Sequence, residues 1–168
     1  DSLQIVELPY KGKELCMVVL LPRNKIGLEE LEKELVGENL TLWRKQMRNM
    51  EIEILLPKFK MTCEYELAKT LVKMGMLDAF EVDGGIADFS GMTGNKELFI
   101  SQVLHKAYVD VNEEGSEASA ATAVVMSKSA GIEPLPVFRA DHPFVFLIED
   151  TKTGSILFMG RVNDPTQE

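Results

Sequence analysis

The feature that most constrains the fold is a run of five consecutive apolar residues near the C-terminus, from Phe144 to Ile148. In a strand, successive side chains point to opposite faces, so this run places large apolar groups on both sides of a sheet. Both faces then need cover from other elements. The rest of the sequence predicts only three modest helices, so we expect part of the native core to come from chain that is missing here.

Hydrophobic periodicity predicts an α+β chain in which strands dominate. Residues 3–10 and 14–21 are β-rich and are separated by the turn residues around Gly12, which predicts a hairpin ended by Pro22. Further strands are expected at 51–56, 99–111, 144–149 and 156–162, and residues 81–94 form a Gly-rich connection without periodicity. Helical spacing predicts helices from Leu28 to Leu35, from Leu40 to Met47 with Asn39 as the N-cap, and from Leu67 to Met74 closed by Gly75. The fold class is therefore α+β, with mixed or antiparallel sheets and a few helices.

Composition excludes several classes of partner. The net charge of -9 argues against nucleic acid or an anionic membrane as the main partner, and no run of 18 apolar residues is present that could span a bilayer. Cys16 and Cys63 are too far apart for a CxxC metal or redox motif, and two histidines are too few for a convincing metal cluster. We expect no metal and no cofactor, and two buried thiols in preference to a disulfide.

A segment of small residues follows the predicted strand 99–111. Between Glu113 and Val125 the chain is almost uncharged, and its only charge after Glu114 is Glu117. A flexible Ala/Ser linker is the simplest explanation, but such a linker has little need for the β-branched residues Val124 and Val125. The pattern predicts a loop able to become a strand.

Several motifs in register resemble the serpins, which are serine protease inhibitors of the suicide type. Residues 138–148, Phe-Arg-Ala-Asp-His-Pro-Phe-Val-Phe-Leu-Ile, resemble the serpin signature. Residues 111–115 resemble the hinge of the reactive loop, 88–92 a characteristic loop and 157–162 the final strand. The resemblance runs from about Leu3 to Pro165. It implies that residues 1–168 are the C-terminal part of a single serpin domain, with a reactive loop at about 113–137, and that the N-terminal half of the fold is lacking.

The resemblance also implies a mechanism. A target serine protease attacks the loop as a substrate and forms an acyl-enzyme, and the cleaved loop then inserts into the main sheet, an established example of strand addition. Insertion requires a hinge that enters a packed sheet without clash or unpaired charge. Gly115 gives a permissive pivot, and alternation leaves Glu117 on the wet face. The hinge residues are Glu113, Gly115, Ser116, Glu117, Ala118, Ser119, Ala120, Ala121 and Thr122.

Two scissile bonds remain open. Family spacing counted from Gly115 makes Ser129 the P1 residue and Ala130 the P1′ residue. By chemistry, Lys128 is the only basic residue between Glu117 and Arg139, and the bond Lys128–Ser129 suits a trypsin-like protease, which we favour as the partner. Ser129 at P1 points instead to an elastase-like protease and Met126 to a chymotrypsin-like one. Lys128 could also be only a solubilising loop residue.

Two residues are assigned to gating of the sheet. His105 resembles the serpin histidine at the top of the main sheet, where the loop first enters, although a lone strand histidine is more often a satisfied polar residue. Lys58 resembles the residue that serpins pair with the hinge glutamate, here Glu113. His142 is expected to position a bend before Pro143. The two histidines thus sit in motifs that are already explained, and we expect no enzyme.

The surface and ending of the chain carry weaker signals. Arg44, Lys45 and Arg48 form a basic helix face that would suit a sulfated polysaccharide, although a solvated face fits the overall charge better. Asn39 begins a glycosylation sequon if the protein is secreted. Residues 162–168 resemble the ending of extracellular serpins, so an extracellular location is expected, with a cytoplasmic alternative.

Three functions stay open at the level of the sequence. The first is a serine protease inhibitor, the second a non-inhibitory serpin that acts as a carrier or chaperone, and the third an inactive fragment. A fragment with exposed sheet edges would pair with an N-terminal serpin half or with a strand-exchange partner.

Overall fold

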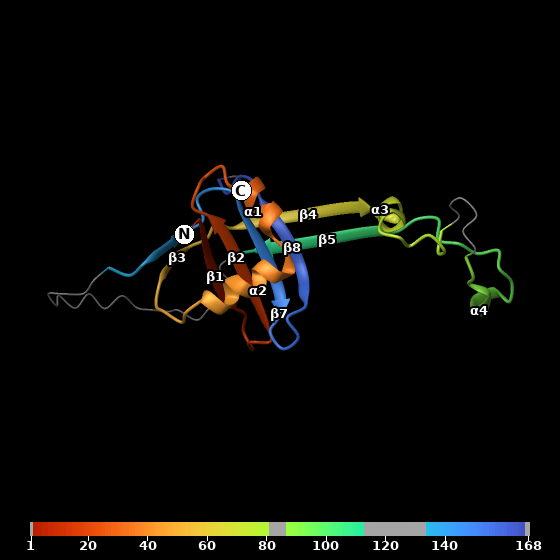
Figure 1. Ribbon diagram of the computed structural model, residues 1–168, viewed down its shortest axis with the longest axis horizontal. Helices are drawn as coiled ribbons and strands as arrows, with labels where there is room; N and C mark the ends of the chain where they lie inside the picture. Colours follow the sequence, from red (N-terminus) through yellow and green to blue (C-terminus); the bar gives the residue numbers. More distant parts are fainter. Residues whose placement is uncertain (1, 81–86, 113–133, 167–168) are drawn as a thin grey trace. The chain divides into compact units, whose positions relative to one another are not determined.

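The computed structural model describes residues 2–80, 87–112 and 134–166. They fall into two compact units, which we name the sheet unit, residues 1–59 and 110–168, and the central unit, residues 60–109. Figure 1 shows the elements of each unit along the chain. None of the helices in these described ranges is long and apolar enough to cross a membrane.

The sheet unit contains a four-stranded antiparallel sheet in the order β1-β2-β7-β8. Its strands are β1 Leu3–Pro9, β2 Leu15–Pro22, β7 Phe144–Asp150 and β8 Ile156–Val162. The predicted hairpin is confirmed, since Tyr10 N donates to Leu15 O at 2.9 Å and Gly12 takes the left-handed conformation of the turn. The two predicted C-terminal strands are confirmed as well. Apolar runs bounded by turn residues were thus sufficient to predict all four strands.

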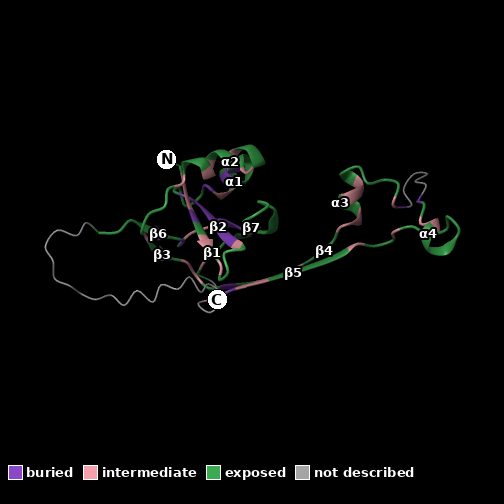
Figure 2. Ribbon diagram, turned by 90° about the horizontal axis from the view of Figure 1, so that it is seen from below, coloured by how far each residue is buried: buried purple, intermediate pink, exposed green. Residues whose placement is uncertain are grey.

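Two helices cover one face of this sheet. They are α1 Leu28–Glu34, which lies within the predicted range, and α2 Gly37–Gln46, which begins three residues before the predicted start at Leu40. Their apolar side chains pack with one set of alternating strand residues, and the cluster contains Cys16, Val18, Leu20, Leu31, Leu40, Val145 and Leu147. Figure 2 shows the buried residues concentrated in this sheet. The helices therefore provide the cover that the apolar strands need on one side.

The opposite face of β7 packs against an aromatic ring from β4. The ring centroids of Phe144 and Phe146 lie 6.0 Å and 5.2 Å from that of Phe59, the first residue of β4. Phe144 and Phe146 are 0% and 1% exposed. The expectation that this run needs cover on both sides is confirmed, with helices on one face and Phe59 on the other.

The predicted N-cap of the second helix is wrong. The helix begins at Gly37 with Val36 as the N-cap, and Asn39 lies inside its first turn. The amide Nδ2 of Asn39 donates to Glu34 O at 2.7 Å, so its side chain bonds the preceding turn and caps no free N–H of the helix. Asn39, the sequon residue, thus has its amide nitrogen engaged within a helix.

A second, two-stranded sheet of the sheet unit pairs β3 Glu53–Leu55 with β6 Val137–Arg139 in parallel. The predicted strand 51–56 is confirmed but shortened to three residues. Strand β6 was not predicted, because it is short and follows Pro134 and Pro136 closely.

The central unit contains most of β4 Phe59–Glu66 and of β5 Leu104–Val111, which pair with each other; Phe59 and residues 110–111 belong to the sheet unit. It also contains α3 Ala68–Lys73, confirmed as predicted with Gly75 in the left-handed conformation, and the short α4 Ser90–Thr93, which was not predicted. Strand β5 begins at Leu104, so the predicted start at Phe99 is too early. Strand β4 was missed, although its residues alternate directly after Pro57.

Both cysteines are free thiols, as expected. Cys16 is buried on β2, whereas Cys63 on β4 is only half-buried, so the expectation of two buried thiols holds for Cys16 alone.

Candidate functional site

The predicted reactive loop falls largely on residues that the structure leaves undescribed, 113–133. These residues include every candidate scissile bond and the whole hinge: Glu113, Gly115, Ser116, Glu117, Ala118, Ser119, Ala120, Ala121, Thr122, Lys128, Ser129 and Ala130. The site is therefore built from the two segments that flank the loop.

Strand β5 leads into the loop. Its last residue, Val111, is 7% exposed. The side-chain Nδ2 of the next residue, Asn112, donates to Asp110 Oδ1 at 3.0 Å. Within the described ranges, β5 pairs along one edge, with β4.

The start of β5 is tied to the end of β4. Leu67 N donates to Val103 O at 2.8 Å, and Glu66 Oε1 accepts hydrogen bonds from Ala68 N at 3.0 Å and Val103 N at 3.2 Å. The backbone donors of Ala68 and Val103 hold the pKa of the Glu66 carboxyl below its ordinary value. An ion pair between Lys106 and Glu64 joins the two strands further along.

The two predicted gating residues lie at different places on these strands. His105 is an exposed residue near the start of β5, and Lys58 is an exposed residue directly before β4. The predicted partner of Lys58, Glu113, lies among the undescribed residues. Pairing of Lys58 with the hinge glutamate, and gating by His105, stay predictions.

The chain that leaves the loop is fixed by parallel pairing. Glu53 N donates to Pro136 O and Ala140 N donates to Leu55 O, both at 2.9 Å, at the two ends of the β3–β6 pair. Phe138 and Ala140 are 4% and 3% exposed, so this flank is also anchored by burial. The exit of the loop is therefore held by contacts separate from those that hold its entry.

His142 fixes the corner between β6 and β7. Its Nδ1 lies 2.7 Å from Asp141 Oδ1 and its Nε2 lies 2.5 Å from Pro22 O. The hydrogen bond from His142 keeps the pKa of Asp141 below its ordinary value. The bend predicted at His142 is present, and the ring joins it to the end of β2.

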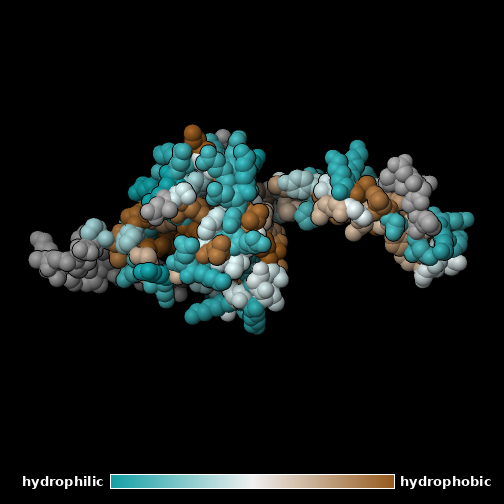
Figure 3. Space-filling view, in the orientation of Figure 1, coloured by the Kyte–Doolittle hydropathy of each residue, from teal (hydrophilic) through white to brown (hydrophobic). Residues whose placement is uncertain are grey.

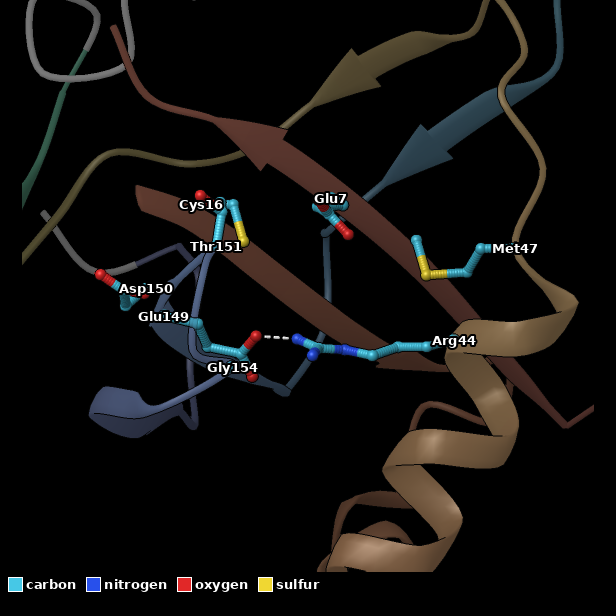
Figure 4. Close-up of a pocket in the computed structure, with 8 residues that line it drawn as sticks. All are labelled: Glu7, Cys16, Arg44, Met47, Glu149, Asp150, Thr151 and Gly154. Carbon is cyan, nitrogen blue, oxygen red and sulfur yellow. Dashed lines mark ion pairs between the residues drawn. The ribbon is translucent and has the colours of Figure 1, made fainter. Parts of the chain in front are cut away.

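A separate pocket lies between α2 and the helix-covered face of the sheet (Figure 4). Its volume is about 220 Å³, and its lining is Glu7, Cys16, Arg44, Met47, Glu149, Asp150, Thr151 and Gly154. Arg44 reaches from α2 to form an ion pair with Glu149, which is 1% exposed and sits opposite Cys16 in the β2–β7 pair. Burial, with Glu7 as a further cause, raises the pKa of the Cys16 thiol.

This ion pair changes the interpretation of the basic helix face. Arg44 turns toward the sheet, so it does not share one solvated face with Lys45 and Arg48. Sequence reasoning missed the pair, because only the position of α2 on the sheet brings residues 44 and 149 together. Among the described residues, no group of three or more His, Cys, Asp or Glu side chains could hold a metal ion.

Comparison with known proteins adds decisive evidence to this geometry. The family model described as "Serpin (serine protease inhibitor)" matches residues 1–165. This chain belongs to the serpin family. Human Serpin B3 is 48% identical over 164 residues, and the Xenopus laevis leukocyte elastase inhibitor is 46% identical over 166 residues. Each alignment covers 96% of this chain, and 41% and 43% of those relatives.

The structural comparison agrees. A crystal structure of uncleaved ovalbumin superposes with a TM-score of 0.82 at 38% sequence identity, and the alignment covers 96% of this chain and 42% of ovalbumin. The serpin resemblance and the fold class predicted from the sequence are confirmed. The serpin chain described here spans about two fifths of the length of the curated relatives that it matches.

The predicted extracellular location is not supported. The relatives include Serpin B3, Serpin B4 and Serpin B9 from human, and this group favours the cytoplasmic alternative. The resemblance of residues 162–168 to extracellular serpins was too short a signal to decide the location.

Proposed function

We propose that this chain is the C-terminal part of a single serpin domain that inhibits a serine protease by trapping it after cleavage of the reactive loop, 113–137. The observation that carries the proposal is the course of β5, which pairs with β4 and runs directly into the small-residue hinge. The similarity to proteins named leukocyte elastase inhibitor supports the same class of activity.

The two flanks of the loop explain why cleavage would release it. Before cleavage the loop is tethered at its entry by β5 and at its exit by β6. Breaking the scissile bond leaves the hinge side attached only to β5, so that segment is free to add to the main sheet as a new strand beside β5. The protease stays covalently attached to the loop as an acyl-enzyme and moves with it. New main-chain hydrogen bonds favour the inserted state over the exposed loop.

We propose Lys128–Ser129 as the scissile bond, and hence a trypsin-like protease as the target. A basic P1 side chain suits a specificity pocket with an acidic base. Ser129–Ala130 stays the competing bond from family spacing. The remaining strands of the main sheet would come from the N-terminal part of the serpin fold, and we propose a cytoplasmic location by analogy with the B-group relatives.

The test is incubation of the full-length protein with trypsin, chymotrypsin and elastase in parallel. A complex that resists boiling in detergent is expected with trypsin, and the released peptide is expected to begin at Ser129. The variant Lys128→Ala should lose the trypsin complex, whereas Lys152→Ala, outside the loop, should keep it. Turnover of the loop without any stable complex would contradict inhibition, and a peptide that begins at Ala130 would move the P1 residue to Ser129.

A further inference from the structure

The ring of His142 faces two groups that only accept hydrogen bonds. Its Nδ1 atom lies 2.7 Å from Asp141 Oδ1, and its Nε2 atom lies 2.5 Å from the carbonyl oxygen of Pro22. A backbone carbonyl and an ionised carboxylate have no proton to donate. A neutral imidazole carries one N–H and one bare nitrogen, so it satisfies only one of these partners. Both hydrogen bonds form together only when the ring carries two protons and a positive charge.

The carboxyl group of Asp141 favours its ionised form in this contact. The hydrogen bond from His142, with the charges of Lys25 and Arg139 as smaller causes, holds the pKa of Asp141 below its ordinary value of 3.8. The reverse arrangement, in which the carboxyl donates to a neutral ring, requires a protonated Asp141. The lowered pKa disfavours that state at neutral pH, so the ring is the donor.

The charged groups around the ring come from its own corner and from two neighbouring segments. Asp141 precedes it, Lys25 lies in the loop after β2, and Arg139 is the last residue of β6. Arg23, the first residue after β2, is exposed. The side chain of His142 is only 10% exposed, and the charge in direct contact with it is the negative one of Asp141. An opposite charge at this distance favours the cationic ring.

The ring lies where the exit of the loop joins the larger sheet. Strand β6, three residues long, ends two positions before Asp141 is passed and β7 begins at Phe144. Pro22 is the last residue of β2, which pairs with both β1 and β7. The backbone anchor of the exit is the short pair of β6 with β3. The contact with Pro22 adds a tie from the exit to the four-stranded sheet.

We propose that His142, as the doubly protonated cation, is a positioning residue that clamps the exit of the reactive loop to the end of β2. The inference rests on the proposed function, in which the protease must first meet the intact loop. A loop held at both ends spends more time in the conformation that fits the protease, and apparent affinity rises with that fraction. When the ring loses its second proton, a lone pair faces one of the two acceptors and that hydrogen bond is lost. The clamp therefore holds at lower pH and loosens as the pH rises.

Three variants separate the charge of the ring from its size and from the general charge of the corner. His142→Gln is neutral and does not titrate, so it lacks the clamp at every pH. His142→Arg is a permanent cation with several N–H donors, so it tests whether charge and donors restore the effect. Arg139→Gln removes a charge from the same corner, leaves both ring contacts in place and serves as the matched control.

The experiment uses the full-length protein and two measurements between about pH 5 and 8. Nitrogen-15 NMR follows the ring nitrogens, and the signals that disappear in His142→Gln identify His142. The rate constant for complex formation with trypsin is measured for each protein, and the ratio of two proteins at one pH cancels the pH dependence of trypsin itself.

We expect both nitrogens of His142 to be protonated at the lower end of this range. There the unmodified protein should form the complex several-fold faster than His142→Gln, and the ratio should fall toward one with the same midpoint as the ring titration. His142→Arg should keep the faster rate throughout, and Arg139→Gln should follow the unmodified protein. The proportion of cleaved inhibitor to complex should not change, because the hinge lies at the other end of the loop.

Each contrary result has a distinct meaning. A His142 ring with only one proton throughout the range overturns the cationic clamp. A protonated ring with a rate ratio that does not follow its titration overturns the positioning role, since the contact would then be only local. An equal slowing in Arg139→Gln also overturns it, because any loss of positive charge at the corner would then suffice. If the unmodified protein forms no complex with trypsin, chymotrypsin or elastase, the proposed inhibition fails and the positioning role fails with it, whereas the NMR result is read independently.

Discussion

Glu149 is the only charged or polar residue that is buried among the residues the structure describes. Removing an ion from water costs several kcal/mol, and Arg44 offsets this cost by placing its guanidinium against the carboxylate. The offset is incomplete, since Glu149 Oε1 and Arg44 Nε find no hydrogen-bond partner among the described residues. The pair therefore fixes where α2 lies on the sheet more than it adds stability.

Removing only Arg44 should be strongly destabilising. We expect Arg44→Met to lower the free energy of unfolding by about 3–5 kcal/mol, because it leaves the Glu149 carboxylate buried without a counter-ion. Urea denaturation of the full-length protein, followed by circular dichroism, measures the change. The double variant Arg44→Met with Glu149→Leu should recover most of the loss. A single variant as stable as the unmodified protein would show that the pair is open to water.

Asp88 is predicted to titrate well below an ordinary aspartate. Lys96 Nζ lies 2.8 Å from its Oδ2 atom, and the backbone and hydroxyl of Ser90 donate to Oδ1 at 3.1 Å and 2.6 Å. These contacts lower the pKa of Asp88 from 3.8 to about 2, and the hydrogen bond from Lys96 contributes most. The ionised form is therefore favoured in the folded state, and this local stabilisation is complete above pH 3.8 and lost as the pH falls through about 2.

Carbon-13 NMR of the Asp88 carboxyl group measures this pKa directly. Lys96→Met should move the midpoint upward toward 3.8, while Ser90 continues to hold it somewhat below that value. A midpoint that does not respond to Lys96→Met would show that the 2.8 Å contact does not persist in solution.

At the scale of elements, patterns that are local in the chain were predicted well. The β1–β2 and β7–β8 hairpins each join apolar runs through a short turn, so sequence neighbours are also neighbours in space. Strands β3 and β6 pair across more than 80 intervening residues, and nothing local in Val137–Arg139 indicates a partner. The signal for β4 is present as alternation directly after Pro57, but no strand was predicted for these residues.

The same limit applies to the site. The loop could be located from its small residues and from the serpin motifs on either side. The contact of Glu66 with Val103 and that of Arg44 with Glu149 each join residues more than 30 positions apart. Such contacts follow from the tertiary arrangement and have no local sequence signature.

Insertion of the hinge as a strand predicts an alternating sensitivity to charge. Ala120 is expected to face the interior of the sheet, whereas Ala121 shares the wet face with Glu117. Ala120→Arg should therefore convert most of the inhibitor into a substrate, because burial of an unpaired guanidinium opposes insertion. Ala121→Arg is the matched control, with the same charge one residue later, and should retain the detergent-resistant complex.

Gel densitometry of the complex and cleaved bands after trypsin treatment measures both variants. Equal loss of complex in Ala120→Arg and Ala121→Arg would argue against insertion as an alternating strand. Full retention of the complex in both variants would show that the hinge does not insert into the sheet.

At the scale of the whole molecule, both units expose apolar surface. Figure 3 shows hydrophobic surface on each of them. In the sheet unit, Leu157 and Met159 of the edge strand β8 are 51% and 57% exposed, and in the central unit Leu104 is 76% exposed. Monomeric proteins rarely expose large contiguous apolar patches, and open strand edges pair readily with other chains. The chain spans only 41–44% of its relatives, so the rest of a serpin fold is a natural source of cover.

These surfaces predict that the isolated 168 residues associate with themselves. Light scattering at micromolar concentration should report a mass well above the 18.8 kDa of one chain. Refolding together with the N-terminal part of the same serpin should instead give one complex of fixed stoichiometry, because the same apolar residues then pack within a single fold. Leu157→Thr with Met159→Thr should reduce self-association while β8 keeps its β-branched character. A monodisperse 18.8 kDa species would contradict the prediction, since the exposed residues would then be tolerated in water without a partner.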